Sequence, residues 1–232
     1  RRRAGPGPAL ALLLTLHTDV HVHLAALPTA GNGVRVSAKM MRSPVLRSVA
    51  WALGLPILDA ETANRLYLER LLGELGASTR VGKAVLLGMD GTYNTAGRLE
   101  ERATDFLIPN DLVFAAAALD RRLLAGVSVN PARRDALDEL ERCAARGAAL
   151  VKVLPNSQGF DPSETRFLPY YRALERLRLP LLSHVGWEFT LIGKDQSAGD
   201  PERLQAPLEA GVTVIAAHGC SRGLLFGDAH FE

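Results

Sequence analysis

The stretch Asp19-Val20-His21-Val22-His23-Leu24 closes an apolar run that begins at Ala9. Residues two apart on a β-strand point to the same face, so the imidazoles of His21 and His23 are predicted to lie side by side near a strand end. Two neutral imidazole nitrogens form a chelating pair for a borderline metal such as Zn²⁺. Taken alone, the pair is a weak signal, because two histidines on a strand are more often hydrogen-bonded residues of the core or the surface.

Further apolar runs downstream also carry a basic side chain. His184 and His218 each follow directly on such a run, and Lys152 lies within another. In a parallel α/β barrel, the carboxyl ends of the strands converge on the active site. The sequence therefore predicts that these side chains meet His21 and His23 at one end of a barrel.

Composition limits the kind of partner. The chain has 232 residues, 47% of them hydrophobic and 22% charged, and a net charge of +2, which suits one large globular α/β domain. So weak a charge, with no basic patch interleaved with aromatic residues, argues against a nucleic-acid surface. We expect a small-molecule substrate, no nucleic-acid partner and no membrane partner, and we leave a homodimer open.

The N-terminal residues resemble parts of a signal peptide, because Arg1-Arg2-Arg3 is followed by the apolar run Ala9 to Leu16. No small-residue cleavage site separates this run from the histidine motif, and the run is shorter than the about 20 residues that cross a bilayer. Cys143 and Cys220 are isolated and predict no disulfide framework. A cytoplasmic location is therefore expected.

Apolar strands alternate with amphipathic helices along the chain. This alternation indicates a parallel sheet covered on both faces, and functional residues on several strand ends favour a closed barrel over an open doubly wound sheet. We interpret residues 1–232 as one barrel domain with an insertion around 31–60 after the first strand. Strands are predicted at 12–24, 81–88, 123–129 and 149–154, with two more ending at His184 and His218. Helices are predicted at 61–75 with Gly76 as its stop, at 111–118, from Asn130-Pro131 to Gly147, from near Pro169, and from Asp200-Pro201 to Gly211, and 155–160 is predicted as a loop.

Four motifs resemble the amidohydrolase superfamily, and within it the amidohydrolase-related branch that also contains the aminocarboxymuconate-semialdehyde decarboxylases. The resemblance extends over about residues 19–219, although 34–56 matches nothing in the family. It is specific for the superfamily and not for a substrate. The motifs are DVHVHL at 19–24, GAALVKVLPNSQGFDP at 147–162, LPLLSHVG at 179–186 and VTVIAAHG at 212–219.

The resemblance implies a (β/α)8 TIM barrel in which His21, His23 and His184 bind a divalent metal. His218 matches a residue that binds a second metal or acts as an acid/base group. Lys152 matches a lysine that is carboxylated and bridges two metals in some relatives. Its role here stays open between a catalytic or bridging lysine and a core-edge lysine paired with a carboxylate.

One family feature is missing from the sequence. The family also uses an aspartate at the end of the eighth strand, as a metal ligand and in hydrolases as the general base. This chain ends at Glu232 after six predicted strands, and Asp228 follows the sixth too closely to be that residue. Because Arg1 also stands where an initiator methionine would, we expect a fragment that forms an incomplete barrel.

The leading hypothesis is a metal-dependent hydrolase acting on an amide, ester or lactone-like bond, with zinc as the expected ion. A bound ion would lower the pKa of water towards about 7 and polarise a carbonyl, and His218 would carry the proton. The alternatives are a metal-dependent non-oxidative decarboxylase using the same site and a truncated, non-catalytic domain. No substrate-binding residue is assigned, because barrel loops vary freely.

Residues next to the histidines receive smaller roles. Asp19 lies on the same strand face and is expected to orient His21 as an outer carboxylate. His17 lies about 13 Å along the strand from His21 and is expected to be structural. Trp187 and Glu188, which follow His184, are expected to be a solvated loop pair, with lining of the pocket as the alternative.

Overall fold

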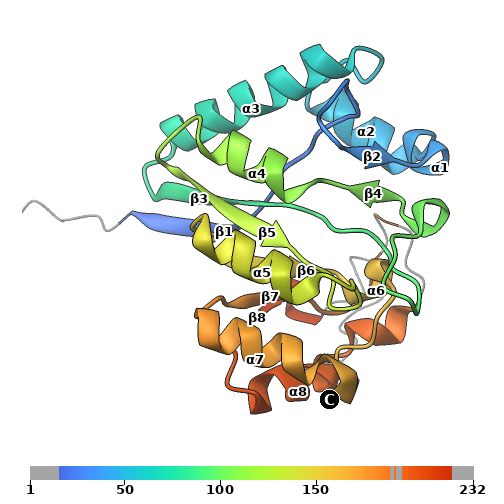
Figure 1. Cartoon of the computed structure of the whole chain (residues 1–232). Helices are drawn as coiled ribbons and strands as arrows, with labels where there is room; N and C mark the ends of the chain where they lie inside the picture. The colour runs from blue at the N-terminus through green and yellow to red at the C-terminus, as the bar shows by residue number, and fades with distance from the viewer. Residues whose placement is uncertain (1–15, 189–190, 192–194, 221–232) are drawn as a thin grey trace, which may run out of the picture.

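Six parallel strands form one sheet in the order β1-β3-β5-β6-β7-β8 in the computed structural model, which describes residues 16–188, 191 and 195–220. The sheet curls into an arc, and within the described residues β1 and β8 are its two edges (Figure 1). The prediction of an incomplete TIM barrel is confirmed. The strands are β1 His17–His23, β3 Val81–Leu87, β5 Leu123–Ser128, β6 Leu150–Val153, β7 Leu181–His184 and β8 Val214–Ala217.

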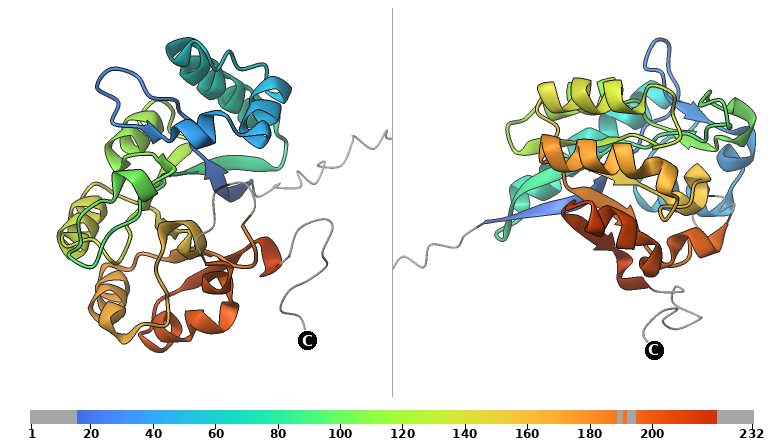
Figure 2. Two further views of the ribbon diagram at one scale, coloured as in Figure 1. Left: turned by 90° about the vertical axis from the view of Figure 1, so that its right-hand side faces the viewer. Right: turned by 60° about the horizontal axis from the view of Figure 1, so that its bottom comes forward.

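Helices cover the convex side of the arc (Figure 2). Two apolar clusters lie beneath them, one under α3 and α4 and the other under α5 and α7. No helix in the described ranges is long and apolar enough to cross a membrane. The main helices are α3 Ala60–Ala77, α4 Asn110–Ala117, α5 Ala136–Ala145, α7 Leu168–Leu177 and α8 Gln205–Glu209, and 3-10 turns lie at Glu101–Ala103, Thr165–Phe167, Gln196–Gly199, Pro201–Leu204 and His218–Cys220.

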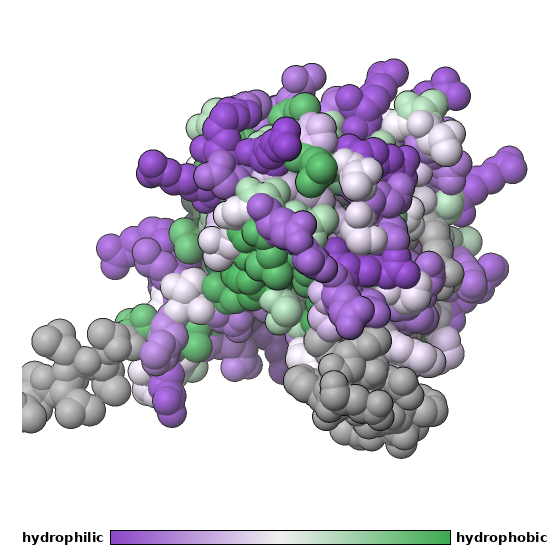
Figure 3. Space-filling view, turned by 90° about the horizontal axis from the view of Figure 1, so that it is seen from below, coloured by the Kyte–Doolittle hydropathy of each residue, from purple (hydrophilic) through white to green (hydrophobic). Residues whose placement is uncertain are grey.

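The inner face of the sheet carries a third apolar cluster, whose members all come from strands. Val85 and Leu87 belong to it, whereas Leu86 between them belongs to the cluster under α3 and α4. This alternation follows from the two-residue period of a strand, and it explains why the strand sequences are apolar on both faces. Seen from below, the surface is mostly hydrophilic, with apolar side chains gathered near its centre (Figure 3).

The segment after β1 contains elements too short to show a sequence period. β2 Arg35–Val36 pairs antiparallel with β4 Phe106–Leu107, and the helices α1 Ala38–Met41 and α2 Pro44–Ala52 follow. Each of these helices begins at a serine whose side chain accepts a backbone N–H of the first turn, Ser37 for α1 and Ser43 for α2. Such caps stabilise helices that packing alone specifies weakly.

Three local predictions were wrong. The helix predicted to start at Asn130-Pro131 begins at Ala136, because the Asn130 side chain is buried and bonds to other loops instead of capping a helix. Residues 155–158, predicted as a loop, form the short helix α6 Pro155–Gln158. Helix α3 continues through Gly76 to Ala77, and the backbone N–H of Ser78 then bonds to the Glu74 carbonyl.

Asn130 joins three of the loops that leave the carboxyl ends of the strands. Its Nδ2 donates to the carbonyl of Gly91 after β3, at 2.9 Å, and to that of Gln158 after β6, at 3.1 Å. Its Oδ1 accepts the Ala132 N–H at 2.9 Å, and the residue is fully buried. The amide therefore fixes the loops that surround the open end of the sheet.

We expect Asn130→Ala to lower the free energy of unfolding by about 2–4 kcal/mol, because it leaves buried backbone groups without partners. Urea unfolding followed by circular dichroism measures the change. Asn94→Ala is the matched control, since that side chain caps a surface turn, and we expect it to cost about 1 kcal/mol or less. Equal losses in the two variants would contradict the role given to Asn130.

Candidate metal centre

Parallel pairing brings the basic residues to one end of the sheet. Lys152 on β6 pairs with Leu182 on β7, and His184 pairs with Ala217 on β8. His218 is the next residue after Ala217, so these three basic side chains lie at the carboxyl ends of adjacent strands. On the opposite edge, the Tyr67 hydroxyl from α3 donates to the carbonyl of His23 and holds the end of β1.

The four histidine rings form a continuous chain inside the arc. The ring centroid of His21 lies 4.9 Å from that of His23 and 4.7 Å from that of His218. The ring of His184 lies 4.7 Å from His218 on the other side. β1 and β8, which are the two edges of the described sheet, therefore approach each other through their imidazoles.

Two of the ring nitrogens already have the spacing of metal ligands. The Nε2 atoms of His21 and His23 are 3.1 Å apart, and two nitrogens bound tetrahedrally to one zinc ion lie about 3.3 Å apart. Among the residues that the structure describes, the buried Nε2 of His184 has no hydrogen-bond partner. Within the described ranges, no three His, Cys, Asp or Glu side chains are yet arranged as a group that holds a metal. Three neutral imidazole donors at one end of the sheet are the chemistry that a divalent ion such as zinc requires.

The histidines are held in the neutral form that binds metals. Burial lowers the pKa of His21 to about 3, that of His23 to about 4 and that of His184 to about 3. The positive charge of Lys152 is the next largest cause in all three cases. Burial and Lys152 also lower the pKa of His218.

Lys152 is one of the most deeply buried side chains, at 1% exposure. In the described part of the chain, its Nζ makes no hydrogen bond. Burial lowers its pKa to about 7, while the negative charge of Glu188 opposes this shift. A buried amine of this kind is available for chemistry at neutral pH, as the catalytic alternative requires.

Backbone strain marks the end of β8. His218 has φ 69°, in the left-handed region that few residues other than glycine adopt. Strain of this kind persists where the surrounding structure enforces it, and it is concentrated at functional sites. The turn directs the His218 ring towards His21 and His184.

Two residues beside the histidines differ from expectation. Asp19 accepts the backbone N–H of His21 at 2.9 Å, at the point where the register of β1 against β3 shifts, so it holds the backbone of His21 and not its ring. Glu188 is not solvated, because its side chain is 11% exposed and its Oε2 lies 3.6 Å from the Nδ1 of His184. The loop position of Glu188 in the sequence gave no sign of this burial.

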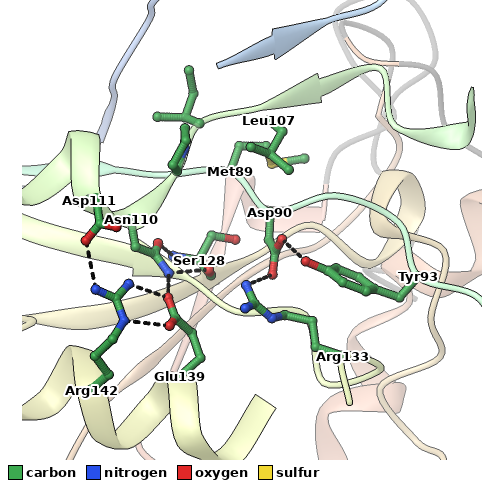
Figure 4. A pocket seen from close by; sticks show the side chains of 12 residues that line it. Met89, Asp90, Tyr93, Leu107, Asn110, Asp111, Ser128, Arg133, Glu139 and Arg142 are labelled. Atoms are coloured by element: carbon green, nitrogen blue, oxygen red, sulfur yellow. Dashed lines mark hydrogen bonds and ion pairs between the residues drawn. The ribbon is translucent and has the colours of Figure 1, made fainter. Parts of the chain in front are cut away.

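A polar cavity of about 420 Å³ opens between the loops after β3 and β5 (Figure 4). None of the histidines and no atom of Lys152 lines it. Its deepest carboxylate, Asp90, accepts bonds from the Tyr93 hydroxyl at 2.8 Å and from Arg133 at 3.3 Å. Burial raises the pKa of Asp90, and Arg133 opposes the shift. Glu139 and Arg142 pair in the same way, so the charges of this cavity satisfy one another and stabilise the loops.

Comparison with known proteins identifies the family. The sequence model of a family described as amidohydrolase matches residues 18–219, which is most of the chain. The chain belongs to the amidohydrolase family. The prediction of an enzyme from this family of divalent-metal-dependent hydrolases is thereby confirmed. No curated protein is significantly similar in sequence to this amidohydrolase.

Two solved structures show the same fold as this amidohydrolase. An uncharacterised TIM-barrel protein from Bordetella bronchiseptica is 18% identical with a TM-score of 0.58, over 88% of this chain and 67% of that protein. The apo form of the Metarhizium anisopliae IDCase is 15% identical with a TM-score of 0.55, over 88% of this chain and 65% of that protein. The chain thus spans about two thirds of the length of these structures.

The histidine pKa values predict how the stability of the metal-free amidohydrolase depends on pH. Histidines of the unfolded chain titrate at pH about 6.5, whereas those of the folded chain have pKa values of about 3 to 4. Between these pH values the unfolded state binds more protons than the folded state. The contribution of these histidines to the free energy of unfolding is therefore fully present above pH about 6.5 and is lost as the pH falls towards about 3 to 4. We expect urea midpoints to decrease from pH 7 to pH 4.

His184→Asn removes one of these groups and should make that decrease shallower. Urea titrations at four pH values on both proteins provide the comparison. A midpoint that stays constant or rises as the pH falls would mean that the imidazoles are not held neutral.

Proposed function

We propose that the protein is a zinc-dependent hydrolase of amide, ester or lactone-like bonds, with the ion bound by His21, His23 and His184. The observation that supports this most strongly is the donor set itself. Two imidazole nitrogens lie 3.1 Å apart, and a third, the buried Nε2 of His184, has no hydrogen-bond partner among the described residues. Zinc is proposed because neutral imidazoles suit it better than they suit magnesium or calcium.

The residues around the donors support proton transfer. When bound, a divalent ion polarises a carbonyl and lowers the pKa of water. His218 lies in ring contact with both His21 and His184, so its imidazole is placed to take a proton and return it to a leaving group. Lys152, buried below the rings, is proposed to act on the substrate or ion by its charge.

A second candidate is a metal-dependent decarboxylase. The observation that favours it is Lys152, whose buried amine lies at the strand ends with its pKa lowered to about 7, so that its protonated form is available at neutral pH to pair with a carboxylate substrate. Release of CO₂ from carboxylated aromatic or muconate-like compounds, measured beside hydrolysis of amides, esters and lactones, distinguishes the two reactions.

We also propose a cytoplasmic location. The support for it is that the Cys143 thiol is buried and free, as is usual for proteins in a reducing compartment.

Metal removal and one substitution test the hydrolase proposal. We expect the purified protein to contain zinc, and chelation or His21→Ala to reduce kcat/KM by about 10³-fold, because several kcal/mol of transition-state stabilisation is lost. Metal analysis and kinetics on the same samples provide the measurement.

His17→Ala is the matched control, because His17 lies on the same strand and is exposed. It should retain both metal and activity. Full activity in a metal-free protein or in His21→Ala would disprove the proposal.

A further inference from the structure

The loop after β7 places a carboxylate behind His184. The side chains of Glu188 and His184 are 11% and 5% exposed, and Glu188 Oε2 lies 3.6 Å from His184 Nδ1. His184 has a backbone hydrogen bond with Trp187, and its Nε2 has no partner, so that bond uses Nδ1. The ring therefore presents Nδ1 to the loop and leaves Nε2 available. At 3.6 Å, the carboxylate acts on the ring through its charge and not through a hydrogen bond.

The position of Glu188 is fixed on both its backbone and its side chain. The Gln196 side chain accepts the Glu188 N–H at 2.9 Å and donates to its carbonyl at 2.7 Å. The second carboxylate oxygen, Oε1, accepts the Leu191 N–H at 2.9 Å. With Oε1 occupied in this way, Oε2 is directed to the ring of His184.

The buried amide of Asn156 connects the residues that fix Glu188 to the strand that carries Lys152. The Asn156 side chain, which follows β6, donates to the Gly186 carbonyl and to both oxygens of Gln196 at 3.1–3.2 Å. The loop also passes so close to itself that a Cβ at Gly199 would lie 2.1 Å from the Gly186 carbonyl oxygen. Only glycine fits at that contact, so the close approach of Gly199 to Gly186, two residues before Glu188, is built into the sequence.

Glu188 is also the acidic group that acts on the other basic residues of the centre. Burial lowers the pKa of both Lys152 and His218, and the charge of Glu188 raises both. Asp19, the other nearby carboxylate, is directed to the backbone of His21. A cluster of basic groups around the buried Lys152 that also receives a divalent cation needs such a negative charge nearby.

We propose that Glu188 is a positioning residue of the metal centre, whose charge favours the His184 tautomer with its proton on Nδ1 and so leaves Nε2 as the donor to the ion, and which offsets the charge of the ion and of Lys152. Outer groups that fix the tautomer of a metal-binding histidine are worth about 10- to 100-fold in metal affinity. The inference rests on the proposed function, because it requires His184 to bind the ion.

The test is the affinity of the whole chain for Zn²⁺, measured by competition with a chromophoric chelator. Glu188→Gln keeps the shape of the side chain and removes its charge, and we expect it to weaken Zn²⁺ binding about 10- to 100-fold. Glu188→Asp keeps the charge but shortens the side chain, and it should give an intermediate affinity. Glu164→Gln is the control, because Glu164 is an ion-paired but exposed carboxylate and should leave the affinity unchanged.

Absorption of the Co²⁺-substituted proteins distinguishes a positioning residue from a metal ligand. The band positions of Glu188→Gln should match those of the unaltered chain, because Glu188 is not itself a ligand. Unchanged Zn²⁺ affinity in Glu188→Gln, or in Glu188→Asp if the first variant does not fold, would overturn this inference and leave the proposed function intact. A shifted Co²⁺ spectrum would overturn the positioning role, and an unaltered chain that binds no Zn²⁺ would overturn the proposed function as well.

Discussion

Parallel pairing of the strands is the constraint on which the rest of this molecule depends. Because all strands of the main sheet run in one direction, every carboxyl end lies at the same end of the arc. Because the sheet curls, its two edge strands approach each other, so that the ring of His21 on one edge contacts the ring of His218 at the other. A flat sheet with the same sequence would keep these rings far apart.

Grouping Lys152 with the histidines is electrostatically unfavourable, and this indicates a functional site. Placing the buried Lys152 among several imidazoles disfavours their protonated forms, and the charge of Glu188 on the described loop after β7 opposes this effect for Lys152 and His218. Groups of this kind are retained at sites where neutral nitrogen donors and a displaced pKa serve chemistry. The polar network around Asn130 and Asp90 lies outside this centre and keeps the loops around it in place.

Much of the fold followed from sequence patterns, because apolar runs and strand period are local properties. The side-by-side placement of His21 and His23 is one example, and the alternation of strands and helices is another. The burial of Glu188 was not predicted, because it depends on residues distant in the sequence. Asn156 donates to the carbonyl of Gly186, and Gly199, more than ten residues after Glu188, packs against both. The helix start at Asn130 was wrong for a related reason, because a capping residue and a buried bridging amide have the same local sequence. Contacts of long sequence separation are invisible to a local pattern.

The central claim is that imidazoles from separate strands share one cation, and anomalous diffraction from a crystal grown with zinc tests it most directly. The account predicts one strong peak within about 2.0–2.1 Å of the Nε2 atoms of His21, His23 and His184. A peak at a different place, or no peak at full zinc saturation, would contradict it.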